Sequence, residues 1–299
     1  MGDYDQPMRA IAADVLLAVE NGESLSQCLP PALQRLALNE RPVLQALCYG
    51  TCRWFHRLDS ELVSRLKKPI KKPDRIVHHL MLIALFQLRF SQQATYAILN
   101  ETVEACRALD KPHLTGLVNA VLRAAEREGA PEPENDASRF SHPVWMVEKL
   151  RHNWPDNWQQ ILEANNAQAP MTLRVNALRF NRDEYLALLN EAGIEATATQ
   201  FAPQGIQLGR PVQVDQLPWF ADGAVSVQDE AAQLCTTLLD LAPGQRVLDA
   251  CAAPGGKTCA ILESQAELAE VVAIDESAAR LPRVQENLDR LDLRASLLQ

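Results

Sequence analysis

The chain has 299 residues, of which 47% are hydrophobic and 22% are charged, so it is long enough for roughly two or three globular domains. No apolar run approaches the ~18 residues that span a bilayer, and the N-terminal MGDYDQPMRA lacks a signal-peptide pattern, so we expect a cytoplasmic protein without membrane attachment. A net charge of −9 argues against binding of polyanions over the whole surface, because such binding depends on cations.

Hydrophobic residues recur at helical spacing through residues 1–128. They repeat at i, i+3, i+4 and i+7, which places them on one face of a helix, and no stretch alternates as a strand does. The examples are Ile11, Val15, Ala18 and Val19; Leu99, Val103 and Cys106; and Leu114, Leu117, Val118, Val121 and Leu122. We therefore predict an all-α helical bundle as the first domain.

Basic residues are concentrated in residues 41–90. This window holds ten Lys and Arg against three Asp and Glu, a net charge of +7, which leaves −16 for the remainder. The lysines at its centre could bind RNA phosphates, and a solvated helix face is the alternative. Trp54 and Phe55 could stack on a base, although packing in a core is the expected role. The central lysines are Lys67, Lys68, Lys71 and Lys72.

Residues 129–140 are predicted to be a linker, because GAPEPENDAS contains two prolines, a glycine and small polar residues. A small α/β module is expected over 141–227. Its predicted elements are helices around 145–150, 158–164 and 183–192, and strands at 171–175 and 205–208. His142, Trp145 and Trp154 are expected to pack inside this module, which offers no catalytic constellation.

From residue 228 onward, strands and helices alternate. The predicted order is a helix over 231–241, a strand over 246–250, a helix to 262, a strand over 271–274, a helix over 277–290 and a strand over 295–298. Such alternation indicates parallel strands with helices packed on the sheet. We expect 228–299 to be the first part of a Rossmann-like domain.

The loop after the first of these strands carries the most informative motif. It contains Cys251, Ala252, Ala253, Pro254, Gly255, Gly256 and Lys257. Ligands of open α/β sheets bind beyond the carboxyl ends of the strands, and the free amides of a helix N-terminus suit an anionic group. Asp275 ends the second strand about 20 residues later, where an acid can bind ribose hydroxyls. The sequence therefore predicts a nucleoside-containing cofactor.

Three kinds of cofactor fit this loop to different degrees. The dinucleotide fingerprint GxGxxG is absent, which argues against a dehydrogenase. The P-loop pattern GxxxxGK[ST] is nearly matched, except that Cys251 replaces its first glycine. Asp249 would repel a polyphosphate, whereas it favours the sulfonium and ammonium groups of S-adenosylmethionine. The methyl donor is favoured, and a nucleoside triphosphate or a purely structural turn remains as an alternative.

The string DACAAPGGKT at 249–258 resembles the cofactor motif of RNA (cytosine-5)-methyltransferases of the RsmB (Sun/Fmu) family. Residues 226–232 and 173–176 also resemble that family. The first domain is similar to the transcription antitermination factor NusB, through residues 47–51, 100–103 and 116–123. The resemblance therefore covers the whole chain.

The resemblance implies an enzyme that forms 5-methylcytosine in small-subunit ribosomal RNA. It implies that the residues from Cys251 to Lys257 line S-adenosylmethionine and that Asp275 holds its ribose. In the family one cysteine adds to C6 of cytosine and a second assists product release, in Pro-Cys and Thr-Cys motifs on later strands. No later strand here carries either motif, and the sequence ends at Gln299 after about three strands. We therefore assign no catalytic residue and expect this chain alone to be inactive.

The cysteines of this chain suggest no substitute nucleophile. Cys251 adjoins the cofactor loop without an activating base, and Cys259 is expected to face into a helix. The seven cysteines form no CxxC pair and the six histidines lack zinc-finger spacing, so we expect buried free thiols and no metal site. A monomer is favoured. The alternative functions are a non-catalytic RNA-binding protein of the antitermination type and a P-loop nucleotide-binding protein.

Overall fold

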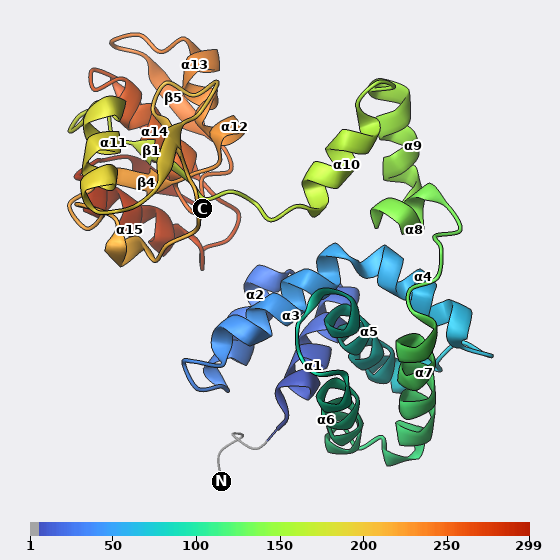
Figure 1. The fold of residues 1–299 in the computed structure, drawn as a ribbon. Coiled ribbons are helices and arrows are strands. Elements are labelled where there is room, and N and C mark those ends of the chain that lie inside the picture. Colours follow the sequence, from blue (N-terminus) through green and yellow to red (C-terminus); the bar gives the residue numbers. More distant parts are fainter. Residues whose placement is uncertain (1–5) are drawn as a thin grey trace. The chain divides into compact units, whose positions relative to one another are not determined.

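The computed structural model describes residues 6–299, and the chain divides into two compact units, 1–167 and 168–299 (Figure 1). Seven helices of the first unit correspond to the predicted bundle. They are α1 (Met8–Glu20), α2 (Leu25–Gln34), α3 (Arg41–Arg53), α4 (Phe55–Arg65), α5 (Arg75–Phe90), α6 (Thr95–Ala108) and α7 (Thr115–Glu128), with short 3-10 turns η1 (Lys72–Asp74) and η2 (Pro112–Leu114). The helical periodicity of the sequence is confirmed in α1, α6 and α7.

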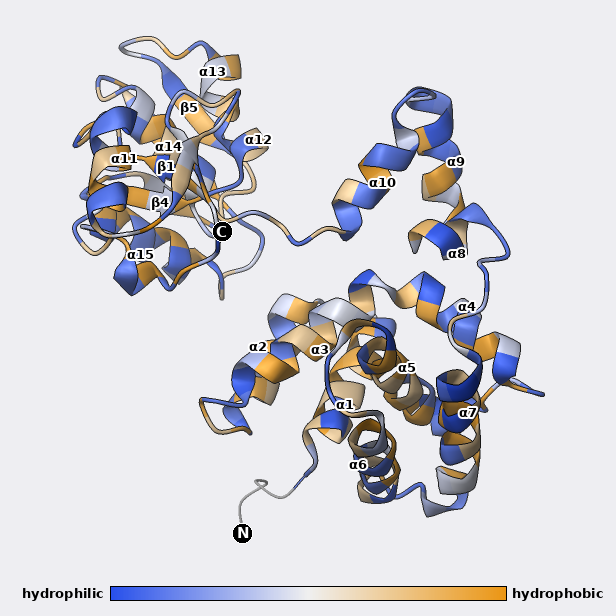
Figure 2. Ribbon diagram, in the orientation of Figure 1, coloured by the Kyte–Doolittle hydropathy of each residue, from blue (hydrophilic) through white to orange (hydrophobic). Residues whose placement is uncertain are grey.

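Helix α5 is the central helix of this bundle. Every residue from Val77 to Leu85 is buried, and Figure 2 shows the apolar residues that gather on this helix. A helix that is buried on all sides must be enclosed by its neighbours. Gly50 of α3 lies against Phe86, where a Cβ would approach the ring to 2.1 Å. The missing side chain therefore allows α3 to pack closely on α5.

Three shorter helices complete the first unit: α8 (Asp136–Phe140), α9 (Val144–Asn153) and α10 (Trp158–Asn166). Helix α8 forms inside the predicted linker, because Asn135 caps it by accepting a hydrogen bond from the Ser138 amide at 2.9 Å. The expectation of a linker throughout 129–140 is therefore wrong over 136–140. The small core of these helices consists of Phe140, Val147 and Leu162.

The aromatic residues expected to pack in the middle module behave differently from one another. His142 is buried, as predicted. Trp145 and Trp154 are 64% and 51% exposed, so the expectation that they are buried is wrong. The indole that covers the core of α8 to α10 is Trp158, whose ring lies 5.4 Å from that of Phe140.

The second unit opens with a four-stranded antiparallel sheet in the order β2-β3-β1-β4. Its strands are β1 (Thr172–Val175), β2 (Ala196–Ala198), β3 (Gly205–Leu208) and β4 (Val225–Val227), and α11 (Arg182–Glu191) and the turn η3 (Val214–Gln216) join them. Leu173, Tyr185 and Ile206 are completely buried in its core. The sequence predicted β1, β3 and α11, but it did not predict β2 and β4, which have three residues each.

A three-stranded parallel sheet follows in the order β5-β6-β7, which confirms the predicted alternation. It contains β5 (Arg246–Asp249), α14 (Gly256–Ser264), β6 (Glu270–Ile274), α15 (Leu281–Leu291) and β7 (Ser296–Leu298). The single helix expected over 231–241 is instead two short helices, α12 (Glu230–Gln233) and α13 (Cys235–Leu239). Left-handed backbone at Asp240, with φ +49°, follows the second of them. Among the described helices, none combines the length and the apolar character needed to cross a membrane.

Candidate functional site

The candidate site lies where β5 meets α14. Gly255 precedes this helix with φ +101°, a left-handed conformation that favours glycine. A Cβ at Gly255 would also lie 3.1 Å from Cγ1 of Val284. The loop can therefore turn sharply into α14 because this position carries no side chain.

The first turn of α14 presents backbone amides. The first N–H groups of a helix have no partner within it, and no side chain caps this helix. These amides, from Gly256, Lys257 and Thr258, form the partly positive end of the helix, which suits a carboxylate or a phosphate.

Asp275, at the end of β6, is tied to the loop that follows β5. It is 6% exposed, and its Oδ2 accepts a hydrogen bond from the Ala253 amide at 2.9 Å. Its Oδ1 accepts one from the Ser277 amide at 3.1 Å. These backbone hydrogen bonds hold the pKa of Asp275 below its ordinary value. The structure thus shows Asp275 organising the loop and the turn after its own strand.

Asp249, the last residue of β5, contacts both ends of the same loop. Its Oδ2 accepts a hydrogen bond from the hydroxyl of Thr258 at 2.7 Å, and its Oδ1 lies 3.4 Å from the Cys251 amide. In a P-loop the hydroxyl at this place serves a metal ion beside a polyphosphate. Here it is engaged by a carboxylate, which argues against a nucleoside triphosphate.

The structure brings the eight predicted cofactor residues together at the carboxyl ends of β5 and β6. Ala252, Ala253, Gly255 and Asp275 are buried, Gly256 is half-buried, and Cys251, Pro254 and Lys257 are exposed. Of this motif, only Cys251, Pro254 and Lys257 therefore expose their side chains to solvent.

Two residues that the sequence did not suggest also hold this loop. Arg280 donates to the carbonyl of Ala253 at 2.6 Å, and Asn287 donates to the carbonyl of Pro254 at 2.9 Å. They are seven residues apart, which places them on one side of a helix that starts near Arg280. Their spacing in the sequence indicated that the two side chains lie on one side of a helix. Nothing in the sequence alone indicated that this side contacts the loop.

Cys251 and Cys259 differ sharply in their surroundings. Cys251 is exposed, whereas burial raises the pKa of the Cys259 thiol to about 12. The dipeptide Thr-Cys does occur at 258–259 and at 51–52, but within α14 and α3 rather than on a strand. The predicted burial of free thiols is confirmed at Cys48, Cys106 and Cys259 but is wrong at Cys251.

Four basic residues of the first unit, Arg65, Lys67, Lys68 and Lys71, line a hollow on its surface. Lys67, Lys68 and Lys71 are exposed on the connection between α4 and α5, not along a helix face. They border a hollow of about 790 Å³ whose floor includes Leu117 and Ile70. Trp54 is half-buried and stacks on Phe90 with ring centres 4.9 Å apart, as expected for a core residue.

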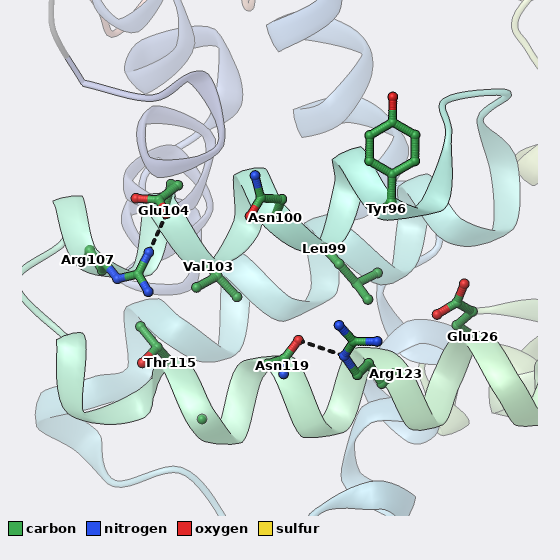
Figure 3. A pocket seen from close by; sticks show the side chains of 11 residues that line it. Tyr96, Leu99, Asn100, Val103, Glu104, Arg107, Thr115, Asn119, Arg123 and Glu126 are labelled. Atoms are coloured by element: carbon green, nitrogen blue, oxygen red, sulfur yellow. Dashed lines mark hydrogen bonds and ion pairs between the residues drawn. The ribbon is translucent and has the colours of Figure 1, made fainter.

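A second groove of about 660 Å³ runs between α6 and α7 (Figure 3). Tyr96 at one end is 80% exposed. The walls hold polar side chains at helical spacing above a floor that includes Leu99 and Val103. These wall residues are Tyr96, Asn100, Glu104 and Arg107 on α6, and Thr115, Asn119, Arg123 and Glu126 on α7.

Three family models match successive parts of the chain. Residues 6–127 match the NusB family, and residues 142–215 match the ferredoxin-like domain of RsmF/B-like methyltransferases. Residues 236–299 match the 16S rRNA methyltransferase RsmB/F model. The crystal structure of PH0851 shares the fold, with a TM-score of 0.75 and 20% identity over 100% of this chain and 69% of that one.

Curated relatives match nearly the whole chain. The ribosomal RNA small subunit methyltransferase B of Pseudomonas syringae pv. tomato is 49% identical, over 97% of this chain and 66% of the relative. The protein of the same name from Pseudomonas putida is 50% identical, over 97% of this chain and 68% of the relative. The chain therefore spans about two thirds of the length of these relatives. It belongs to the ribosomal RNA small subunit methyltransferase B family.

Proposed function

We propose that this protein takes part in S-adenosylmethionine-dependent formation of 5-methylcytosine in small-subunit ribosomal RNA. The observation that carries the proposal is the loop between β5 and α14, which Asp275 ties to the next strand through Ala253. Membership of a family whose relatives are named as ribosomal RNA small subunit methyltransferases supports the substrate. Such a substrate also favours a cytoplasmic location.

The residues of the loop fit the methyl donor. The amides of the first turn of α14 suit its carboxylate, and Asp249 suits its sulfonium and ammonium groups. Each oxygen of Asp275 keeps a second lone pair beyond its amide hydrogen bond, so the side chain can still accept from a ribose hydroxyl. When bound, the cofactor supplies an electrophilic methyl group. The chain itself supplies the orientation of that group.

RNA contact is best supported in the first unit. Lys67, Lys68 and Lys71 offer mobile cations for phosphates, and the exposed ring of Tyr96 offers a stacking surface for an unpaired base. The groove beside Tyr96 carries amide, guanidinium and carboxylate groups that can bond to base edges (Figure 3). We propose that these surfaces hold ribosomal RNA, and that the chain acts as a monomer.

Calorimetry with S-adenosylmethionine and with ATP tests the cofactor. We expect binding of the methyl donor and none of ATP, and the reverse result would favour a P-loop protein. Transfer of labelled methyl groups to unmethylated small-subunit RNA by a complete relative tests the reaction. A complete relative that binds this RNA but transfers no methyl group would favour the non-catalytic RNA-binding alternative.

A further inference from the structure

A buried guanidinium connects the antiparallel sheet of the second unit to α14, the helix that follows the proposed cofactor loop. Arg174 lies on β1 and is 4% exposed. Its neighbours Leu173 and Val175 belong to the core of that sheet. Because successive side chains of a strand point to opposite faces, Arg174 points away from this core and meets α14.

Arg174 holds α14 at two positions on one side of the helix. Its Nε and Nη2 donate to the two carboxylate oxygens of Glu263 at 2.9 and 2.8 Å, a bidentate pair that is almost completely buried. Its Nη1 donates to the carbonyl of Gly256 at 2.8 Å. Residues 256 and 263 are two helical turns apart. A planar group bonded at both positions fixes the tilt and the rotation of α14.

The contact with Gly256 lies in the turn whose amides face the proposed ligand. Gly256 is the first residue of α14 and follows Gly255 directly. The same Nη1 also donates to the side chain of Gln228, which is 8% exposed and lies beside Gly256. The backbone N–H of Gln228 donates to the carbonyl of Thr172 on β1 at 3.0 Å. The sheet therefore supports the first turn of α14 through two connected side chains.

Arg290 makes a comparable link, and its own hydrogen bonds include no residue of the loop between β5 and α14. It lies on α15 and donates to the carbonyls of Phe220 and Val225 at 2.9 and 3.0 Å and to the hydroxyl of Ser226 at 3.0 Å. Burial holds the pKa of Arg290 below its ordinary value. Arg290 is thus a matched control for Arg174, because it joins the same sheet to the other helix.

We infer that Arg174 is a positioning residue, which sets the first turn of α14 so that its amides meet the carboxyl group of S-adenosylmethionine. This inference rests on the proposed function. A small displacement of preorganised groups weakens their interaction strongly, since they must match the ligand without rearranging. The antiparallel sheet, which has no catalytic constellation of its own, then contributes to the cofactor site through Arg174.

The first test compares Arg174→Lys with Arg290→Lys in the 299-residue chain. Lysine at 174 keeps a cation beside Glu263, but one ammonium cannot reproduce the bidentate pair together with the bonds to Gly256 and Gln228. By calorimetry we expect Arg174→Lys to weaken S-adenosylmethionine about tenfold or more, as is typical when a supporting hydrogen bond is removed. The affinity of Arg290→Lys for S-adenosylmethionine should stay within about threefold of that of the unsubstituted chain. This should hold even if Arg290→Lys lowers Tm as much as Arg174→Lys does. Equal affinities of both variants would overturn the inference.

The second test needs no ligand and uses hydrogen–deuterium exchange. In Arg174→Lys the amides of residues 259–262, which donate hydrogen bonds at the start of α14, should exchange faster while those of 285–291 are unchanged, and Arg290→Lys should give the opposite pattern. Unchanged exchange at 259–262 in Arg174→Lys would also overturn the inference. Should Arg174→Lys fail to fold, Arg174→Met combined with Glu263→Gln removes the unpaired buried charge and is judged by the same two measurements.

An unsubstituted chain that binds no S-adenosylmethionine would refute the proposed function, while the exchange pattern would still decide the role of Arg174.

Discussion

The carboxylate of Asp275 accepts a hydrogen bond from the backbone amide of Ala253 at 2.9 Å, across the ends of two neighbouring parallel strands. The side chain that ends β6 therefore shapes the loop that follows β5. Arg280 reinforces this arrangement, because its guanidinium lies 3.8 Å from the same carboxylate oxygen and donates to the carbonyl of Ala253. The conformation of the loop thus depends in part on the carboxylate that is also the proposed acceptor of the ribose hydroxyls.

Replacing Asp275 should weaken the methyl donor. Asp275→Ala removes the acceptor of the Ala253 amide and the proposed ribose contact, so we expect a loss of affinity of about tenfold or more, as for charge-assisted hydrogen bonds. Asp275→Asn keeps one carbonyl acceptor, so its affinity for the methyl donor should lie between those of the unsubstituted chain and Asp275→Ala. Calorimetry provides the measurement, and Glu276→Gln at the exposed neighbouring position is the control. Unaltered affinity in Asp275→Ala would remove this residue from the site.

Gly255→Ala should destabilise the second unit more than Gly244→Ala. Both glycines have positive φ, +101° and +80°, so alanine at either carries the backbone cost of roughly 1–2 kcal/mol. Around Gly244 the space is open, whereas a Cβ at Gly255 meets Val284. Urea unfolding curves of the two variants give the difference. Equal free energies of unfolding would show that the side chain of Val284 can move away from the added methyl group without loss of stability.

The cofactor loop was predictable from sequence because its signals are local. A short strand, a glycine pair and an acid at the end of the next strand follow one another within 30 residues, and the parallel sheet brings them to one edge. The hydrogen bond between Asp275 and Ala253 was not predictable, since it depends on how two loops approach each other. The same applies to Arg174, whose partners Gly256 and Glu263 are more than 80 residues away.

The errors in the fold predicted from the sequence have similar causes. Strands β2 and β4 are three residues long, too short for an alternating pattern to stand out. Helix α8 depends on one cap at Asn135 within a stretch rich in proline. Trp145 was expected to pack in the middle module, yet it is 64% exposed on α9, because a large apolar residue type does not by itself determine burial.

The helical bundle should lose stability in acid through Glu20. Its carboxylate binds Arg75 at 2.8 Å and His79 at 2.8 Å, and the hydrogen bond from Arg75 is the main cause that lowers the pKa of Glu20 from 4.5 to about 2. Because the folded-state pKa lies below the unfolded one, the stabilisation is complete above pH 4.5 and is lost as the pH falls toward 2. Glu20→Gln should therefore unfold more easily than the unsubstituted chain near neutral pH, with a gap that narrows below pH 4.5.

Thermal unfolding followed by circular dichroism across this pH range tests the role of Glu20. Glu23→Gln, on the exposed turn after α1, is the control and should change Tm little at any pH. A gap between the unsubstituted chain and Glu20→Gln that stays constant from neutral to acidic pH would contradict the lowered pKa.

The lysines between α4 and α5 should govern the salt dependence of RNA binding. Replacing Lys67, Lys68, Lys71 and Lys72 by glutamine should weaken binding of single-stranded RNA and reduce the slope of log K against log salt by about 0.7 for each phosphate that is no longer neutralised. Fluorescence anisotropy at several salt concentrations gives the slope. Lys149→Gln, at an exposed position of α9, is the control. An unchanged slope in the fourfold variant would leave these lysines as solvated surface residues.

A cytosine adduct at C6 requires an accessible thiolate beside the methyl donor, and neither Cys251 nor Cys259 provides one. Burial raises the pKa of Cys259 to about 12, so almost no thiolate forms there near neutral pH. Cys251 is exposed, but no hydrogen bond to its thiol occurs in residues 6–299, so no base is placed to activate it. In the presence of S-adenosylmethionine we expect RNA that contains 5-fluorocytidine to form no covalent adduct with the 299-residue chain, as judged by mass spectrometry, while a thiol reagent modifies Cys251 well before Cys259. An adduct that disappears in Cys251→Ala but persists in Cys259→Ala would identify Cys251 as the nucleophile and contradict this expectation.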